Sequence, residues 1–322
     1  MTTEIRSLDQ APGPWPAHEI SAGDYRATIS GVGGGLASLT YRGVPLVVGY
    51  GREEIRPYYR GALLAPWPNR VYDARWRHGG HTHELAITEP ARGHALHGLL
   101  AWAPFTVLEH EGDALTAVAE VPAQDGYPHH VLVQVAYRLD DAGGLDWALT
   151  AFAMSDGAPV GLGLHPYLSA GTGRVDDWSA HVPYRCVYQT RGPRLEPDGV
   201  VDVAEQPELD LTDGPLLAGR TIDHAYCQPS EEVSVIDVRS AVPDGAPEGV
   251  RGVRMVTEAP WLQVHTADRD DDPAANRAGL AVEPMTCAPG ALNDLDGGAH
   301  PITVLALGES LTVACSISAL TH

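Results

Sequence analysis

Short segments in which apolar and polar residues alternate recur along most of this chain. In HVLVQVAYRL (130–139), every second residue from Val131 to Leu139 is apolar, which places one hydrophobic face along an extended strand. The turn-forming DDAGG (140–144) leads into a second run, LDWALTAFAM (145–154). Two such runs joined by a glycine-containing turn predict a β-hairpin.

Comparable runs continue to the C-terminus, in FTVLEH (105–110), ALTAVAEV (114–121), VSVIDV (233–238), WLQVHTA (261–267), GLAVEPM (279–285) and LTVACSISA (311–319). Few segments show apolar residues with helical spacing over three turns, and the chain contains 35 Gly and 26 Pro. Many short strands joined by tight turns are typical of an all-β fold. We therefore expect a large antiparallel β-sandwich or barrel.

The chain is expected to form one domain. An all-β domain can reach 322 residues without dividing, and 44% apolar residues are enough for a sizeable core. No internal repeat or composition change marks a boundary. The N-terminal residues 1–17 carry APGPWPA and no periodicity, so we interpret them as a loose lead-in to a single domain over 18–322.

Composition excludes several classes of function. The formal net charge is -21, whereas proteins that hold nucleic acid or anionic membranes present a basic face. We therefore expect neither partner, and a neutral small molecule is the favoured ligand. All 21 positively charged residues are arginine. The absence of lysine excludes Schiff-base chemistry, pyridoxal phosphate attachment and a Walker lysine.

The four cysteines are far apart in the sequence and form no C-x-x-C pair, which argues against a zinc ribbon or a thioredoxin-like motif. No signal peptide and no apolar span long enough for a bilayer is recognisable. We expect buried, reduced thiols in a cytoplasmic protein.

Two ionisable residues occupy matching positions at the ends of apolar runs. His165 closes GLGLH and Glu283 closes LAVE, and each is followed directly by a proline that favours extended backbone. An imidazole and a carboxylate are the pair that general acid–base catalysis needs. Taken singly, each residue is also compatible with a structural role, as a core histidine or a strand-end surface carboxylate.

Two other clusters contain residue types that bind metal ions, but their spacing does not fit a metal site. His78, His81 and His83 occur together, and His81 and His83 should point to one side of a strand, but no second ligand pair is nearby. We interpret this segment as a turn with exposed imidazoles. The aspartates of TADRDDDPAANRAG (266–279) lack the spacing of a calcium loop, and a solvated turn is the favoured interpretation. No metal site is predicted.

Seven motifs occur in an order that resembles one family. They are NRVYDARW (69–76), LHGLLAW (96–102), GYPHHVLVQVAYRL (126–139), GLGLHPYL (161–168), IDHAY (222–226), WLQVHT (261–266) and LAVEPMT (280–286). Each motif is weak alone, but this order resembles that of the aldose 1-epimerases, or mutarotases, from about residue 20 onward.

The resemblance implies a fold, a reaction and a set of site residues. The fold would be the galactose mutarotase-like antiparallel β-supersandwich with a shallow sugar cleft. His165 would be the general acid and Glu283 the general base that interconvert the α and β anomers of a free hexose, with no cofactor. The sugar would contact the residues that match the remaining motifs: Asn69, Arg70, His97, Asp223 and Gln263.

Three departures from the family pattern concern the choice of sugar. Leu168 stands where the family has phenylalanine, which suggests a changed apolar wall of the cleft. The LHG motif continues as Leu-Leu-Ala-Trp (99–102), where many family members have a second glycine. The segment ARGHA (91–95) before it replaces an asparagine-rich segment of the family.

Two alternative functions remain open on the same scaffold. One is a hexose-6-phosphate 1-epimerase, which needs clustered arginines, and Arg56, Arg60, Arg70, Arg75 and Arg77 are close in sequence. The other is a non-catalytic sugar-binding protein.

Overall fold

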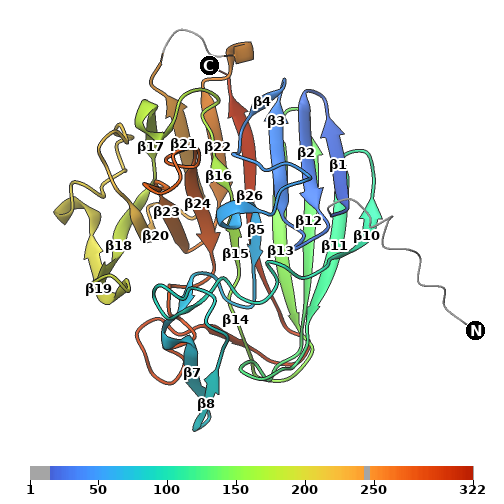
Figure 1. Cartoon of the computed structure of the whole chain (residues 1–322), viewed down its shortest axis with the longest axis vertical. Helices are drawn as coiled ribbons and strands as arrows, with labels where there is room; N and C mark the ends of the chain where they lie inside the picture. Colours follow the sequence, from blue (N-terminus) through green and yellow to red (C-terminus); the bar gives the residue numbers. More distant parts are fainter. Residues whose placement is uncertain (1–14, 243–246, 322) are drawn as a thin grey trace, which may run out of the picture.

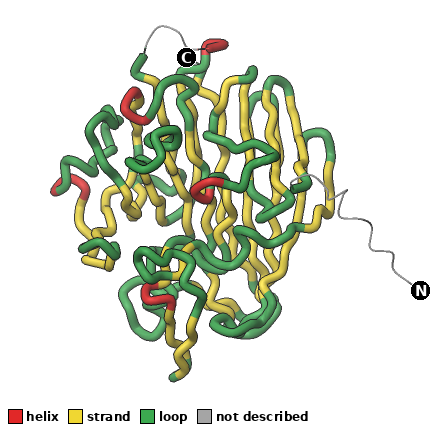
Figure 2. Tube along the Cα trace, in the orientation of Figure 1, coloured by secondary structure: helices red, strands yellow, loops and turns green. Residues whose placement is uncertain are grey.

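The predicted all-β architecture is confirmed by a computed structural model, which describes residues 15–242 and 247–321. Strands dominate and helices are confined to short 3-10 turns (Figures 1 and 2). Residues 1–14 of the predicted lead-in lie outside the described part, and the first strand begins at Ala17. The 3-10 turns are η2 Pro57–Tyr59, η3 Tyr72–Ala74, η4 Val175–Asp177, η5 Val203–Glu205 and η6 Pro247–Gly249.

One large sheet contains the alternating strands that the sequence predicted. Its order is β10-β11-β12-β13-β26-β22-β21-β17, and each neighbouring pair is antiparallel. The strands are β10 Thr106–His110, β11 Ala114–Val121, β12 Val131–Asp140, β13 Gly144–Ala153, β17 Trp178–His181, β21 Ser234–Ser240, β22 Gly252–Thr257 and β26 Ser310–Leu320. The predicted hairpin is β12–β13.

A second large sheet lies beside the first and carries the candidate catalytic residues (Figure 1). Its order is β19-β18-β20-β23-β24-β15-β5, and β16 also pairs with β24. The strands are β5 Ala62–Leu64, β15 Gly163–His165, β16 Tyr167–Leu168, β18 Tyr184–Arg191, β19 Glu196–Asp202, β20 Asp223–Pro229, β23 Trp261–His265 and β24 Leu280–Met285.

Smaller sheets complete the architecture. The N-terminal sheet consists of β1 Ala17–Ala22, β2 Tyr25–Ser30, β3 Leu36–Tyr41 and β4 Val44–Pro45. There are also three two-stranded pairs: β6 Arg70–Val71 with β9 Ala95–Leu96, β7 Arg75–His78 with β8 His81–Glu84, and β14 Ala158–Val160 with β25 Thr303–Leu305. The β7–β8 hairpin projects from the lower end of the molecule in Figure 1.

The largest apolar cluster of the core connects the sheets, and two small clusters lie apart from it. Alternate residues of β12, from Val131 to Leu139, are almost completely buried, as the period-two pattern predicts. Trp147 of β13 and Tyr226 of β20 belong to the same cluster although they come from different sheets. The two large sheets therefore form a sandwich, and this rigid framework holds the strand ends at which the candidate residues lie.

The cysteines are free thiols. Cys227, Cys287 and Cys315 are buried and Cys186 is partly buried, in broad agreement with the sequence-based expectation. None of the helices in the described ranges has the length and apolarity needed to traverse a membrane.

Candidate active site

Adjacent strands of the second sheet bring the predicted acid and base together. β24 lies between β23 and β15, and Gln263 of β23 is the direct register partner of Glu283 of β24. On the other side of β24, β15 ends at His165. The Nε2 atom of His165 lies 3.3 Å from Oε1 of Glu283, although 118 positions (283 − 165) separate them in the sequence.

Both side chains are buried, with exposed side-chain fractions of 5% for His165 and 4% for Glu283. Each also has one buried polar atom that meets no hydrogen-bond partner among the described residues: Nδ1 of His165 and Oε2 of Glu283. Buried polar atoms are rarely left unpaired in folded proteins because desolvation is costly. The pair therefore has unused hydrogen-bonding capacity, as expected of groups that meet a ligand.

Burial changes the ionisation of this pair. It raises the pKa of Glu283 well above its usual value, and the nearby carboxylate of Asp223 adds to the effect while Arg70 opposes it. Burial and the neighbouring His265 lower the pKa of His165 to about 3. Both shifts favour the uncharged form of the pair, in which the proton resides on Glu283 rather than on His165.

Aromatic rings surround His165 and restrict its orientation. The ring of Tyr167 is nearly parallel to that of His165, with centroids 5.2 Å apart. His97 meets His165 edge-on at 5.1 Å, and Tyr59 packs against His97 at 4.7 Å. Burial, and then the proximity of His165, lower the pKa of His97 well below its usual value, so this imidazole is neutral.

A chain of hydrogen bonds links the predicted sugar-binding side chains. The Nδ2 of Asn69 donates to Oε1 of Gln263 at 3.1 Å, and the Nε2 of Gln263 donates to Oδ1 of Asp223 at 2.7 Å. Burial acts to raise the pKa of Asp223, but the charges of His265 and Arg70 outweigh it and the net shift is downward. The lowered pKa of Asp223 favours its ionised form, which accepts this hydrogen bond.

Arg70 is held by a carboxylate that sequence analysis did not identify. Its Nε and Nη2 donate to the two oxygens of Glu89 at 2.8 and 3.0 Å, and Nη1 of Arg92 donates to Glu89 Oε1 at 2.6 Å. A two-point contact of this kind fixes the plane of a guanidinium group. Glu89 occupies a loop without periodicity, so the sequence carried no signal for it.

The backbone at two predicted residues adopts an uncommon conformation. Asn69 has a φ of 54° and His97 a φ of 62°, in the left-handed region that non-glycine residues seldom occupy. The two positions support each other, because the His97 amide donates to the Asn69 carbonyl at 2.9 Å and the Asn69 amide donates to His97 Nδ1 at 3.2 Å. Strained backbone of this kind clusters at functional sites.

All seven predicted site residues line one cavity of about 410 Å³. The cavity also contains residues that the sequence analysis did not select: Tyr58, Tyr59, Glu89, Arg92, Leu96, Tyr167, Thr221, Ile222, His265, Asp268 and Arg269. Of these, Tyr167 could have been predicted from the sequence, because it lies two residues after His165 and alternate side chains of a strand point to the same face. A volume of this size is in the range of small-molecule sites.

The structure corrects the interpretation of Leu168. This residue does not form a wall of the cavity, because it faces the core and is completely buried there. Tyr167 faces the cavity instead. The substitution of leucine for phenylalanine therefore concerns core packing.

The arginines that are close in sequence do not gather in space. Arg56 is buried and donates to the carbonyls of Val32 and Ala101, which is a structural role. Arg75 pairs with Glu84 on the exposed hairpin. Of the five candidates, only Arg70 lines the cavity.

The structure also shows how the two sequence clusters that suggested metal binding are arranged. His78 and His81 face each other across the β7–β8 turn, and His83 stacks on Trp76 with centroids 4.3 Å apart, in agreement with the predicted turn. Within the loop 266–279, Asp268 accepts from Arg277 Nη1 at 2.7 Å. Asp272 accepts from the Tyr58 hydroxyl at 2.7 Å.

Among the described residues, only His97, His165 and Glu283 gather closely enough to offer three ligand atoms to a metal ion. These atoms lie within 4.8 Å of one another. Two of them, His165 and Glu283, are the predicted acid and base, and His97 is one of the predicted sugar-binding residues.

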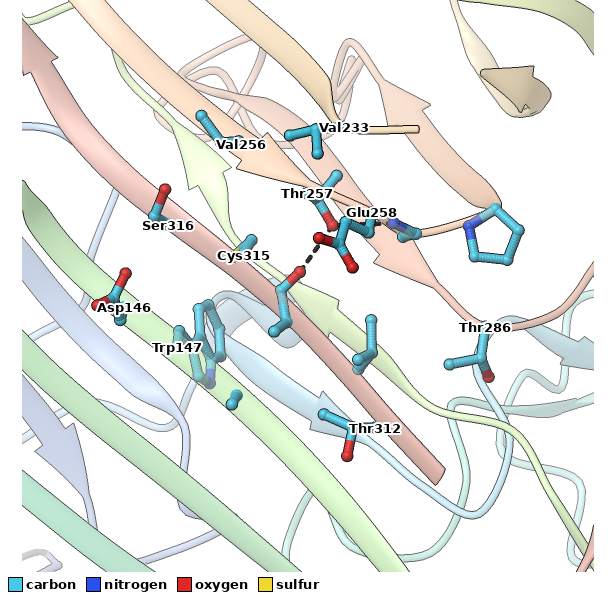
Figure 3. Close-up of a pocket in the computed structure, with 15 residues that line it drawn as sticks. Asp146, Trp147, Val233, Val256, Thr257, Glu258, Thr286, Thr312, Cys315 and Ser316 are labelled. Carbon is cyan, nitrogen blue, oxygen red and sulfur yellow. Dashed lines mark hydrogen bonds between the residues drawn. The ribbon is translucent and has the colours of Figure 1, made fainter. Parts of the chain in front are cut away.

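A second, larger cavity of about 520 Å³ lies by β13, β22 and β26 (Figure 3). It contains the exposed carboxylates Asp146 and Glu258, and the Thr257 hydroxyl donates to the Ala314 carbonyl at 2.7 Å. No histidine lines it. Volume does not select the site, because this cavity and another of about 640 Å³ beside Tyr72 and Trp76 are both larger than the one that holds the buried His165 and Glu283.

Comparison with known proteins identifies the family of this chain. A sequence model of the family "aldose 1-epimerase" matches residues 16–318. The chain belongs to the aldose 1-epimerase family. It is 33% identical to the uncharacterised protein YihR of Escherichia coli K12 over 277 residues, which is 85% of each chain.

Solved structures show the same fold. An aldose epimerase homologue from C. elegans superposes with a TM-score of 0.80 at 18% identity, over 95% of this chain and 99% of that one. A putative aldose 1-epimerase from Escherichia coli K12 gives a TM-score of 0.77 at 21% identity, over 95% and 99%. The expected galactose mutarotase-like fold is thereby confirmed.

Proposed function

We propose that this protein is an aldose 1-epimerase that interconverts the α and β anomers of an aldose by acid–base ring opening and reclosure. The observation that carries the proposal is the buried contact of 3.3 Å between His165 and Glu283 on the wall of a sugar-sized cavity. Membership of the family supports the reaction class.

The reaction needs one base and one acid on the same sugar ring. Glu283 takes the proton from the C1 hydroxyl while His165 gives a proton to the ring oxygen, O5, and the C1–O5 bond breaks to leave an aldehyde. Rotation about C1–C2 presents the opposite face of the carbonyl. The C5 hydroxyl then attacks, with the two proton transfers reversed, and no electrons or groups leave the sugar.

The opposite pKa shifts of the two residues suit this cycle. A Glu283 carboxylate beside a His165 imidazolium contains the same single proton as the uncharged pair of glutamic acid and neutral imidazole. Transfer across the Oε1–Nε2 contact generates it without exchange with solvent. The two groups act as one coupled unit, so the pair rather than either residue sets the pH dependence.

The remaining predicted residues are suited to hold the sugar. Arg70, fixed by Glu89, presents guanidinium donors to hydroxyl oxygens, while Asp223 and Gln263 offer directional partners for neighbouring hydroxyls. None of these contacts requires a cofactor, and the proposal includes none. A cytoplasmic location is part of the proposal and agrees with four free thiols.

A non-catalytic sugar-binding role is less well supported. A binding site gains nothing from burying an imidazole against a carboxylic acid, because desolvation of both groups costs free energy. Such perturbed pairs are typical of catalytic sites.

Polarimetry of freshly dissolved α-D-glucose and α-D-galactose tests the function. Wild-type protein should accelerate mutarotation, and Glu283→Gln and His165→Ala should each lose activity by a factor on the order of 10² to 10⁴. Full activity in Glu283→Gln would disprove the assigned base. Failure of wild-type protein on every neutral and charged aldose would disprove the epimerase activity.

A further inference from the structure

Trp102 is a half-exposed tryptophan beside the candidate active site. It ends the LHGLLAW motif, whose Leu96 and His97 line the cavity. Its exposed fraction is 51%, whereas Trp67 and Trp76 are 2% and 1% exposed. Single exposed apolar side chains are common at protein surfaces, so exposure alone assigns no role. The surroundings of Trp102 decide what its ring can do.

A buried arginine holds the Trp102 ring in place. The guanidinium carbon of Arg56 lies 5.4 Å from the centroid of the Trp102 ring, and a cation at this distance is attracted to the face of an indole. Arg56 is itself fixed, because its Nη1 and Nη2 donate to the carbonyls of Ala101 and Val32 at 2.8 and 2.6 Å. This contact therefore favours one orientation of the exposed ring.

The backbone on both sides of Trp102 is also anchored. The Leu99 amide donates to the Ala65 carbonyl at 2.8 Å, and the Gly33 amide donates to the Ala103 carbonyl at 2.6 Å. A pre-organised aromatic side chain binds a ligand with a small loss of conformational entropy. Trp102 is thus suited to act as a rigid contact surface.

Aromatic rings connect Trp102 to the acid–base pair. The Tyr59 ring, which lines the cavity, lies 6.5 Å from the Trp102 ring and 6.4 Å from the His165 ring, measured between centroids. Exposure increases along these three rings, since His165 is buried, Tyr59 is half-buried and Trp102 is half-exposed. A molecule that is held at His165 and extends along Tyr59 would therefore meet Trp102 where it leaves the cavity.

The chemistry of these rings favours a second sugar as the extension. The C–H face of a pyranose is apolar and can lie flat on an aromatic ring, while its hydroxyl groups stay in water, and tryptophan suits such half-wet contacts. The cavity of about 410 Å³ is in the range of sites for drug-sized ligands, which are larger than one hexose. Epimerisation needs a free C1 hydroxyl, so the second sugar must be attached elsewhere on the reacting one.

We propose that Trp102 forms a second sugar subsite and that the preferred substrate is a reducing disaccharide. Its reducing unit lies at His165 and Glu283, and its other pyranose ring stacks on Trp102. The inference rests on the proposed epimerase function and specifies its substrate class. The chemistry is unchanged, because the reducing unit keeps its free C1 hydroxyl and its ring oxygen. Trp102 contacts only the part of the substrate that does not react.

Anomer exchange measured by NMR provides the test. D-glucose is compared with maltose, cellobiose and isomaltose, and D-galactose with 4-O-β-D-galactosyl-D-galactose, so that each disaccharide has its own reducing unit as the reference. The proteins are wild type, Trp102→Ala and Trp102→Phe. Trp15→Ala is the matched control, because Trp15 is 49% exposed and lies outside the cavity. Thermal unfolding of each variant shows whether it folds.

We expect wild-type kcat/KM for at least one disaccharide to exceed that for its reducing unit on the order of 10-fold, the effect of one stacked aromatic contact. Trp102→Ala should abolish this preference, Trp102→Phe should retain part of it, and Trp15→Ala should retain all of it. The disaccharide with the largest preference identifies the linkage.

Three results would overturn the inference while leaving the epimerase function intact. One is acceleration of a monosaccharide with equal or lower kcat/KM for every disaccharide. Another is a disaccharide preference that persists unchanged in folded Trp102→Ala. The third is a wild-type dimer in sedimentation velocity that Trp102→Ala dissociates, because a second copy of the chain would then cover this ring. Inactivity on all of the sugars would instead refute the epimerase function on which the inference rests.

Discussion

At the scale of single residues, burial controls the chemistry of this site. His165 and Glu283 each have a pKa displaced in the direction that disfavours charge, because the surrounding sheet and aromatic rings exclude water. The sequence indicated both residues through their matching positions before a proline. Their direct contact was implied only by the family resemblance, since no local pattern encodes a pairing across 118 positions (283 − 165).

The raised pKa of Glu283 predicts a pH-dependent difference in stability. The folded state keeps this proton to a higher pH than the unfolded state, so wild-type stability falls as pH rises from about 4.5 towards the folded-state pKa. Glu283→Gln cannot ionise. Its free energy of unfolding, measured with urea between pH 5 and 9, should therefore increase relative to wild type as pH rises.

Glu232→Gln serves as the control, because Glu232 is exposed and lies outside the cavity. A difference between Glu283→Gln and wild type that stays constant over this pH range would contradict the raised pKa of Glu283.

At the scale of elements, alternation predicted the long strands well and the loops poorly. Strands such as β12 and β26 have alternating buried and exposed residues because one face packs on the core. This two-residue period is therefore visible in the sequence. The same period could have placed Tyr167 rather than Leu168 in the cavity. Glu89 and Arg269 come from loops, where no period records which way a side chain points.

The glycines before His165 are predicted to be required by packing. A Cβ at Gly163 would lie 2.9 Å from Pro68 Cβ and 3.3 Å from Met285 Cγ. Gly163→Ala should therefore cost about 1–3 kcal/mol of stability and, by displacing β15, reduce kcat.

Gly112→Ala is the matched control. A Cβ at Gly112 meets no atom within 4 Å, so its stability should change by less than about 0.5 kcal/mol. Urea unfolding and polarimetry measure the two effects. Equal stability of both alanine variants would show that β15 tolerates a side chain at position 163.

At the scale of the whole molecule, the site depends on the complete sandwich. Its residues extend from Asn69 to Glu283 and reach the cavity from both strands and loops. Fold class and family followed from the sequence because strand periodicity and seven ordered motifs are distributed over the chain.

We predict that the chain unfolds as one unit. Activity and tryptophan fluorescence, followed through the same urea titration, should decline with coincident midpoints because one apolar cluster connects the sheets. Loss of fluorescence in two separate steps, with activity following only one, would contradict a single domain over 18–322.

The central claim is that His165 and Glu283 act as one acid–base pair in epimerisation, and a double-variant comparison tests it most directly. Anomer exchange rates are measured for wild type, His165→Ala, Glu283→Gln and the double variant on the best aldose substrate. Residues that act as a unit give strongly non-additive losses. We predict that the double variant is no slower than the slower single variant. Losses that multiply in the double variant would contradict the claim, because they would show that each residue acts independently.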